Sequence, residues 1–545
     1  MGVKKIFLLL VIIISIPTFF QMLRWGIFSM QDFHIFRLIE FDKCIKDLQI
    51  PCRWAADSGA GFGEPLFNFY GQFSYWIGEI FHLISFNLID SIKLTFIFSL
   101  VGSGIAMFFL ARKIWKNNLS ALVSSVIYLY APYRAVDVWV RGALPEALSF
   151  VFFPLIILSI ENYLEKRKKR DLLIFSLLFG LLIINHNLSI ILFAPFLIIW
   201  IIFRLIQIKN IIPFIELGVA GLFSGLLAAF YLLPVIFESK FVNINSTTYG
   251  VYDWRANFVT IYQLFISRFW GYGGSTWGSD DGLSLSIGQM QWIVPLVAGM
   301  IILTRRKITK DNITFFVLAL IGAFGLFLTH NKSTFIWNLL PFMKYIQFSW
   351  RFLSVSIFAL ALASGKIIKD FKKKQWLVTI LIITITIVVN FGFFRPDIWY
   401  QISDKDLENG SKWTESTFSS LPDYWPNFGP LPNKSAPMVT DDISLINKKS
   451  NLQIFKVLHF NRQIEFPIAY FPGWEIHYQG QTTEAAPSKN GLITANLTES
   501  NNNIATLEFK NTPVRTIGNW VSLFAFGLWL IVFVKLKYVK NTRKI

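Results

Sequence analysis

The sequence predicts a mostly α-helical membrane protein: a polytopic bundle of about twelve transmembrane helices with a small exoplasmic β-sandwich-like domain near the C-terminus. Composition supports the bundle, because 54% of the 545 residues are hydrophobic and only 15% are charged. The mean hydropathy is +0.50, and a soluble globular protein of this length does not need so much apolar surface. Repeated apolar runs are long enough to cross roughly 30 Å of hydrocarbon.

The distribution of basic residues predicts the orientation of the bundle. The formal net charge is +18, and Lys and Arg gather in short clusters between apolar runs, as the positive-inside rule describes. The clusters are Lys4–Lys5, 111–116, 165–170, 204–209, 304–310, 369–374 and 535–544. A nucleic-acid site needs basic residues on one continuous face, so no nucleic-acid partner is expected. We therefore predict a multi-pass protein of the cell membrane with both termini cytoplasmic.

Apolar runs between these clusters locate the individual spans. They are predicted at about 6–27, 90–111, 119–133, 147–164, 171–185, 188–203, 211–236, 289–304, 313–329, 352–368, 376–394 and 517–534. The first run resembles a signal peptide because Lys4 and Lys5 precede it. No small-residue cleavage site follows before Asp32, so we interpret the run as a retained span.

The spans divide the chain into three predicted regions. Residues 1–394 form the transmembrane domain with exoplasmic loops, 395–516 form an exoplasmic β-rich domain, and 517–545 form a final transmembrane helix with a basic cytoplasmic tail. Short β-prone runs separated by Pro, Gly and Asn favour strands in the second region. These runs are LQIFKVLHF, IEFPIAYF, WEIHYQG, LITANLT and NIATLEF.

Both cysteines of the chain, Cys44 and Cys52, fall in the first exoplasmic loop. An oxidising exterior permits a disulfide between them. The alternative is two unpaired thiols in a mobile loop, because the sequence does not define the distance between their Cα atoms.

Polar residues at one membrane boundary are the candidates for a functional site. Asp32 follows the first apolar run, in the stretch FSMQDFHIFRLIEF (28–41). Ionisable groups held among apolar helices at a membrane are functional candidates, and several from different loops would line one polar cavity. The further candidates on this side are His34, Glu64, Arg134, Arg141, Glu146, His186 and Arg351.

Several stretches together resemble a known family. They are QDFHIFR (31–37), GFGEPLFNFYGQFSYW (61–76), YLYAPYR (128–134), RGALPEAL (141–148), NHNLS (185–189), YLLPVIFES (231–239), FWGYGGSTWGSDDGLSLSIG (269–288), QFSWRFL (347–353) and AYFPGWEIHYQG (469–480). In this order and loop placement they resemble GT-C-type integral-membrane glycosyltransferases. The most similar branch is the YfhO-like or "6-pyruvoyl-tetrahydropterin synthase-related" membrane proteins.

The resemblance implies transfer of a sugar from a polyprenyl-phosphate donor to a glycan, polymer or protein acceptor of the cell envelope, with inversion at the sugar. It implies that Asp32 is the general base. Arg141 and Arg351 would bind the leaving phosphate, and His34, Glu64, Arg134, Glu146 and His186 would bind substrate.

One departure from the family pattern concerns metal binding. Many GT-C enzymes carry two acidic residues in the first-loop motif, whereas His34 stands at the second position here. Asp32 and His34 could ligate a divalent ion such as Mg²⁺ or Mn²⁺. Two ligands do not define a site, so no cofactor is certain.

Two other classes of function remain open. A transporter or lipid flippase also fits twelve spans with both termini inside, although no similarity between the halves of the chain supports internal repeats. A non-catalytic envelope assembly protein could use the β-rich domain to bind a partner.

Overall fold

Long apolar runs fold as helices because a backbone N–H or C=O inside lipid needs a partner within its own segment. The computed structural model describes residues 3–29, 32–278, 280–371, 373–421, 423–460, 463–499 and 502–542. Helices occupy most of these residues, and strands occur mainly between residues 443 and 509.

The helices are α1 (Val3–Phe19), α2 (Asp32–Lys46), α3 (Leu66–Phe69), α4 (Phe73–Leu83), α5 (Leu88–Trp115), α6 (Asn118–Leu129), α7 (Pro132–Ala135), α8 (Leu144–Lys166), α9 (Lys169–Asn185), α10 (Asn187–Ile208), α11 (Ile212–Leu227), α12 (Ala229–Glu238), α13 (Ile261–Phe265), α14 (Gln289–Arg305), α15 (Lys310–Thr329), α16 (Thr334–Leu339), α17 (Leu353–Ser364), α18 (Lys366–Asp370), α19 (Gln375–Asn390), α20 (Asp404–Leu407), α21 (Gly410–Thr417) and α22 (Pro513–Thr542). The strands are β1 (Ile27–Phe28), β2 (Trp399–Tyr400), β3 (Ile443–Lys448), β4 (Leu452–Val457), β5 (Ile464–Ala469), β6 (Trp474–Tyr478), β7 (Gln481–Glu484), β8 (Ala486–Pro487), β9 (Leu492–Ala495) and β10 (Ile504–Phe509).

Every predicted span overlaps one or two helices, but fewer than twelve helices are long and apolar enough to cross a membrane. Among the described residues eight meet this criterion, and a ninth span results if α11 and α12, bent by 77° at their junction, are taken as one. α6 has 12 residues, and α9 and α14 have 17 each, whereas a span needs about 20. The structure thus supports a multi-pass bundle of eight or nine spans.

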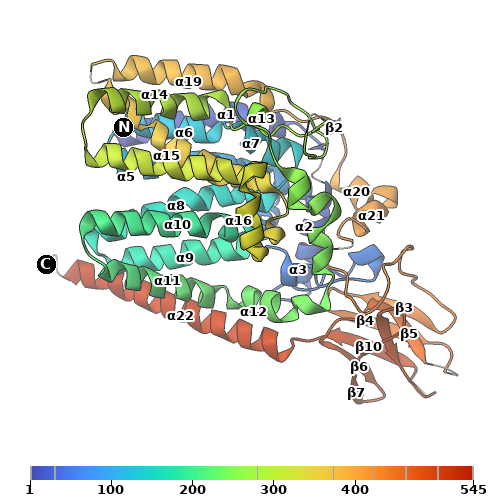
Figure 1. The fold of residues 1–545 in the computed structure, drawn as a ribbon. Coiled ribbons are helices and arrows are strands. Elements are labelled where there is room, and N and C mark those ends of the chain that lie inside the picture. Colours follow the sequence, from blue (N-terminus) through green and yellow to red (C-terminus); the bar gives the residue numbers. More distant parts are fainter. Residues whose placement is uncertain are drawn as a thin grey trace.

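The two ends of the bundle differ (Figure 1). Strands β3–β10 gather at one end, which we call the sheet end, together with α2 and α3. α1 begins and α22 ends at the opposite end, which we call the terminal end. Ion pairs between the basic clusters, such as Lys113–Glu165 and Arg305–Asp370, join neighbouring helices there.

The C-terminal β-region contains two antiparallel sheets. One has the strand order β3-β4-β10-β6-β7, and the other has the order β5-β9-β8. All five sequence runs predicted as strands form strands here, as β4, β5, β6, β9 and β10. The rings of Phe455 and Phe466, one from each sheet, lie 5.3 Å apart in a shared hydrophobic core. A sandwich arrangement and the boundaries 395 and 516 stay predictions.

The first loop packs into the core of the β-region. Trp54 is fully buried, and its ring lies 5.3 Å from that of Trp474 and 5.0 Å from that of Phe509. A buried ion pair between Glu238 of α12 and Arg515 of α22, at 2.9 Å, lies close to the same junction. The loop after α2 is therefore held in place by both the bundle and the sheets.

Candidate functional site

The turn that precedes α8 brings charged side chains together. A π-helical turn, η3 (Val136–Val140), is followed by Arg141, and Gly142 then adopts a left-handed conformation with φ of +58°. Glycine suits this position because it lacks the Cβ atom that disfavours such a backbone. Pro145 lies in the first turn of α8, where a missing N–H removes no helical hydrogen bond. This reversal of the chain leaves Glu146 facing Arg141.

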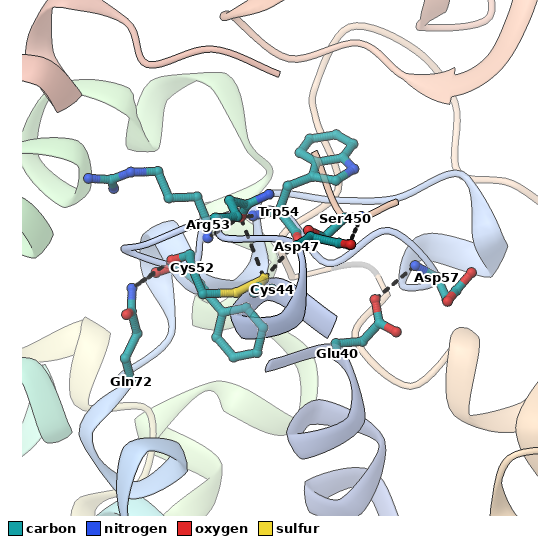
Figure 2. The surroundings of a disulfide bond; sticks show 11 residues. Glu40, Cys44, Asp47, Cys52, Arg53, Trp54, Asp57, Gln72 and Ser450 are labelled. Carbon is teal, nitrogen blue, oxygen red and sulfur yellow. Dashed lines mark hydrogen bonds between the residues drawn. A yellow bond between two sulfur atoms is a disulfide. The ribbon is translucent and has the colours of Figure 1, made fainter. Parts of the chain in front are cut away.

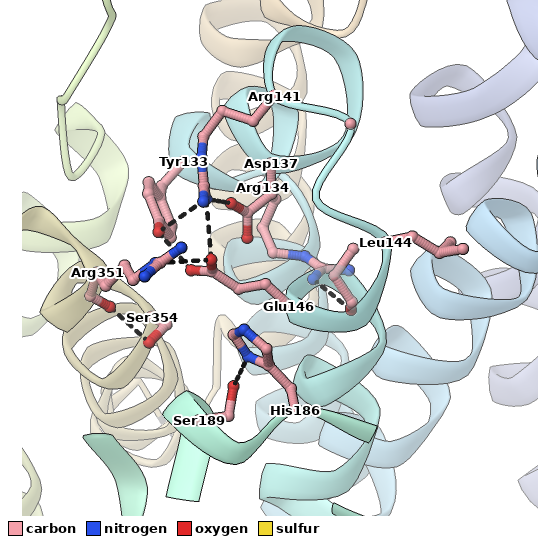
Figure 3. Close-up of polar contacts among 12 residues, drawn as sticks. Tyr133, Arg134, Asp137, Arg141, Leu144, Glu146, His186, Ser189, Arg351 and Ser354 are labelled. Carbon is pink, nitrogen blue, oxygen red and sulfur yellow. Dashed lines mark hydrogen bonds and ion pairs between the residues drawn. The ribbon is translucent and has the colours of Figure 1, made fainter. Parts of the chain in front are cut away.

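Glu146 is the centre of a buried polar cluster (Figure 3). Tyr133 Oη donates to its Oε1 at 2.5 Å, and Arg141 Nη1 donates to its Oε2 at 2.9 Å. Arg351 Nε lies 3.4 Å from the same oxygen, and Arg141 also pairs with Asp137. We call these five residues the Glu146 cluster. Glu146 is only 2% exposed, so the cluster is shielded from water.

The Glu146 cluster contains two guanidinium groups and two carboxyl groups, so buried groups of opposite formal charge lie together, as buried charges require. Arg141 also covers the ring of Trp350, with 4.6 Å between the guanidinium carbon and the ring centroid. Arg351 Nη1 donates to the carbonyl oxygen of Ile346 at 2.8 Å and to Gln347 Oε1 at 2.7 Å. Protein groups therefore engage both arginines that the sequence suggested for phosphate binding.

Arg134, another predicted substrate-binding residue, makes structural contacts. Its side chain is fully buried, and it donates to the carbonyl oxygen of Ala147 at 3.1 Å and to Ser103 Oγ at 2.9 Å. These bonds tie α7 to α8 and α5. They account for the position of the guanidinium without a ligand.

His186 lies in the break between α9 and α10, beside the Glu146 cluster (Figure 3). Its Nδ1 is 2.7 Å from Ser189 Oγ, one turn further along the chain. The structure thus brings five of the predicted residues to one place: Arg141, Glu146, His186 and Arg351 directly, and His34 through the turn at Gly142, as follows.

His34 attaches α2 to the turn at Gly142. Its Nδ1 is 2.8 Å from Tyr75 Oη, and its Nε2 hydrogen-bonds to the carbonyl oxygen of Gly142. The carbonyl partner assigns the proton to Nε2, so Nδ1 accepts from the tyrosine. Burial and the charge of Arg37 lower the pKa of His34, which keeps the ring neutral.

This geometry bears on the predicted metal pair. Because both ring nitrogens of His34 are engaged, a metal ion would have to displace Tyr75 or the Gly142 carbonyl. The side chain of Asp32 lies outside the part of the chain that the structure describes; its backbone opens α2. Among the described side chains, no group of three or more His, Cys, Asp or Glu residues is arranged to hold a metal ion.

Glu64 lies apart from the Glu146 cluster. It is fully buried, Ser58 Oγ donates to its Oε1 at 2.7 Å, and Ser58 in turn is 2.6 Å from Ser420 Oγ. Its Oε2 has no hydrogen-bond partner among the described residues. Burial raises the pKa of Glu64 to about 7, against the smaller opposite effect of the serine hydroxyls.

Arg37 is a candidate that sequence reasoning missed. Its side chain is 8% exposed and lies over the ring of Tyr70 at 4.1 Å. Within the described part of the chain it has no carboxylate at ion-pair distance, and its Nε has no hydrogen-bond partner. Burial raises the pKa of Asp423 and Arg37 partly lowers it, so the two groups influence each other without pairing. The spacing of His34 and Arg37, three residues on one helix, could have indicated a shared face.

The cysteines stabilise the end of α2 (Figure 2). A disulfide joins Cys44 to Cys52, with 5.5 Å between the Cα atoms. Gln72 Nε2 donates to the carbonyl oxygen of Cys52 at 3.0 Å. Asp47 accepts from the backbone N–H of Ser450 at 2.6 Å. The disulfide thus lies where the first loop meets the β-region.

A comparison with known protein families shows which family the chain belongs to. Residues 67–395, well over half of the chain, match the family model described as "6-pyruvoyl-tetrahydropterin synthase related domain; membrane protein". The chain belongs to this family. The matched range includes the whole Glu146 cluster and His186, and it excludes α2, the disulfide and strands β3–β10. As a member of a membrane protein family with several long apolar helices, the chain is a multi-pass membrane protein.

The chain is similar to an uncharacterized protein of Lactococcus lactis subsp. cremoris (strain MG1363). The two are 23% identical over 258 residues, which cover 45% of this chain. The match spans 42% of the relative's length.

Proposed function

We propose that the protein is a membrane glycosyltransferase that transfers a sugar from a polyprenyl-phosphate donor to a cell-envelope acceptor. The reaction takes place at the sheet end, which we assign to the exoplasmic side, and Asp32 is the general base. The observation that carries the proposal is Arg37, a buried guanidinium without a carboxylate partner among the described residues, on the same helix as Asp32.

An anionic ligand accounts for this arrangement. Among the described residues Arg37 contacts tyrosines, Tyr70 through its ring and Tyr75 through a hydrogen bond, which do not neutralise its charge. A buried charge without a counter-charge is costly, and a bound anion offsets that cost. The phosphate of the donor lipid suits a guanidinium, whose planar fork donates two parallel hydrogen bonds to phosphate oxygens. Arg37 is therefore the main phosphate-binding residue of the proposal, in place of Arg141.

The surroundings of Tyr252 indicate where substrate would lie. This residue belongs to a short helical turn, η6 (Gly250–Tyr252), in the third large loop. Burial and Asp423 raise the pKa of Tyr252, whereas Arg351 and Arg37 lower it. The ring of Tyr252 lies 5.9 Å from that of Phe348, and the guanidinium of Arg351 lies over the same Phe348 ring at 4.9 Å. This loop therefore borders the Glu146 cluster, which supports a substrate site on its α2 side.

The carboxylates have different roles in this proposal. Glu146 is held by two arginines and a tyrosine, so it is a poor proton acceptor and instead positions Arg351. Asp32 takes the proton of the acceptor hydroxyl while the phosphate leaves from the other face of the sugar, as in inverting glycosyl transfer. Glu64, with a pKa of about 7, is the next candidate for the base.

A transfer assay with purified protein, a polyprenyl-phosphate sugar and an envelope acceptor tests the proposal. Asp32→Asn should reduce the rate on the order of 100-fold or more, the usual effect of losing a positioned base. Asp42→Asn is the matched control, because Asp42 lies on the same helix and pairs with the exposed Lys46. An Asp32→Asn protein that folds and transfers sugar at the parent rate would exclude Asp32 and direct attention to Glu64.

The 77° bend between α11 and α12 favours the alternative, a transporter or lipid flippase. Broken helices are common in transporters, where they line the substrate path. Proteoliposomes distinguish the two functions. Translocation of the lipid-linked sugar without formation of a glycosylated product would support the flippase and contradict the transferase.

A further inference from the structure

A pocket of about 630 Å³ opens at the terminal end of the bundle, far from the candidate site. Its polar lining consists of Arg112, Lys113, Lys116, Asn118, Asn162, Glu165 and Lys166. Glu146 and Glu165 lie 19 residues apart on α8, which at 1.5 Å per residue is about 28 Å. This distance is close to the hydrocarbon thickness of a bilayer, so the pocket and the Glu146 cluster lie at opposite faces of the membrane.

The charge of this pocket is unbalanced. Four basic side chains and a single carboxylate line it. Lys113 forms an ion pair with Glu165 and donates a hydrogen bond to Asn162 Oδ1 at 2.9 Å. The side chains of the other three cations have no ion-pair or hydrogen-bond partner in the described ranges. These three, which we call the free cations, are Arg112, Lys116 and Lys166.

A neighbouring pocket of about 320 Å³ provides an internal contrast. It shares Lys113, Lys116 and Glu165 with the first pocket, and it is also lined by two further carboxylates, Glu161 and Asp311, and two further cations, Arg204 and Lys310. Glu161 there binds Arg204 through two hydrogen bonds of 2.8 Å each. Asp311 is paired as well, with Lys369. The larger pocket therefore has a greater excess of cations over carboxylates than its neighbour.

The wall of the larger pocket is amphipathic. Phe109 of α5 and Leu158 of α8 also line the pocket. Each precedes the cations on its helix by one or two turns and so lies nearer the interior of the membrane. Lys116 and Lys166, at the ends of these helices, are exposed. Positive charge at the depth of lipid headgroups and apolar side chains below it match the two parts of a phospholipid. A small soluble phosphate would leave the apolar wall unused.

We propose that this pocket binds an anionic phospholipid of the leaflet at the terminal end. The free cations hold its phosphate, and its acyl chains lie along Phe109 and Leu158. The site is independent of the proposed transferase reaction, because it lies at the opposite face of the membrane and shares no residue with the candidate site.

Native mass spectrometry of the full-length protein, titrated with phosphatidylglycerol or phosphatidylcholine, tests the proposal. The wild-type protein should retain phosphatidylglycerol in preference to phosphatidylcholine. The triple variant Arg112→Gln, Lys116→Gln, Lys166→Gln should bind phosphatidylglycerol on the order of tenfold more weakly or worse, because each cation near an anionic lipid contributes to the attraction.

The matched control is the triple variant Arg306→Gln, Lys307→Gln, Lys374→Gln. These exposed cations lie in the basic clusters after α14 and before α19 and do not line the pocket. The control has the same net charge as the test variant, and its affinity should equal that of the wild type. If both variants lost affinity for phosphatidylglycerol equally, the binding would reflect general attraction to the positive surface, and the proposal would be overturned. Complete displacement of the lipid by an equal concentration of glycerol phosphate would overturn it too, in favour of a soluble phosphate.

Discussion

At the scale of single residues, two buried glutamates at the sheet end have opposite surroundings. Glu146 contacts two arginines and a tyrosine, whereas the hydrogen bond to the Glu64 carboxylate among the described residues comes from a serine hydroxyl and no ion pair reaches it. Charge partners stabilise a buried carboxylate in its ionised form, and burial without them favours the protonated form. The two residues should therefore respond differently to the same substitution by glutamine.

Glu146→Gln should destabilise the protein by about 3–5 kcal/mol, because it leaves Arg141 and Arg351 buried with a single remaining carboxylate, that of Asp137. Thermal unfolding in detergent measures this. Glu165→Gln is the control on the same helix: its side chain is 50% exposed, so its loss should change the unfolding free energy by at most about 1 kcal/mol. Similar effects of both substitutions would contradict the buried cluster.

Glu64 should make stability depend on pH near neutrality. In the unfolded chain its carboxyl ionises above pH 4.5, whereas the folded protein retains the proton up to about pH 7. Between these values the folded state binds more protons, so stability is highest at low pH and falls as the pH rises toward 7. The full loss corresponds to about 3 kcal/mol, because the pKa of Glu64 is 4.5 in the unfolded chain and about 7 in the folded protein.

Glu64→Gln mimics the protonated side chain and should remove this dependence. Melting temperatures measured from pH 4.5 to 8.5 should coincide for the variant and the wild type at the acid end. At the alkaline end the variant should be more stable. Parallel curves over the whole range would show that Glu64 ionises normally in the folded protein.

At the scale of elements, α2 carries the side chains that connect the candidate site to the rest of the sheet end. His34, Arg37, Phe41 and Cys44 follow one another at intervals of three or four residues, so they share one face of the helix. His34 contacts the turn before α8, and Cys44 is bonded to the loop that packs into the β-region. The position of Arg37 depends on both ends of the helix being held.

The Cys44–Cys52 disulfide should be present in protein purified from cell membranes without reductant, because its loop is assigned to the oxidising exoplasmic side. Alkylation without reductant should modify neither cysteine, and alkylation after reduction should add two groups by mass. Replacing Cys44 and Cys52 together by Ala should cost about 2–4 kcal/mol, the usual contribution of a native disulfide. Full alkylation of both thiols before reduction would contradict the bond.

Sequence periodicity predicts some elements better than others. Long apolar runs and five β-prone runs correspond to observed helices and strands. Sequence periodicity misses β7, whose four polar residues are all exposed. An edge strand with no buried face shows no alternation of apolar and polar residues to detect. Periodicity also gives no sign of the 77° bend at Ala228, since the backbone N–H of Phe230 is satisfied there by Ser522 of the distant α22.

At the scale of the whole molecule, the sheet end and the terminal end should lie on opposite sides of the membrane. The β-region is at one end of the bundle, and both chain termini are at the other (Figure 1). Clusters of Lys and Arg, such as those at 111–116 and 165–170, lie at the helix ends of the terminal end. Positive loops are retained in the cytoplasm during insertion, so the sheet end should be exoplasmic.

Single cysteines in a Cys44→Ala, Cys52→Ala background test this orientation. Asn490→Cys lies on the β-region and Lys307→Cys at the terminal end, and both positions are exposed. A membrane-impermeant maleimide should label the first in intact cells and the second only after lysis. The reverse pattern would invert the orientation and remove the exoplasmic assignment of the proposed reaction.

The sequence by itself determined the membrane class, most helix positions, five of the strands and the set of polar residues near one boundary. These follow from local properties: the length and hydropathy of a run, its periodicity, and the basic residues beside it. Which polar residues meet was decided by the tertiary structure alone. Arg351 reaches Glu146, and Arg37 reaches no described carboxylate, because ion pairing depends on distances between helices that only packing sets.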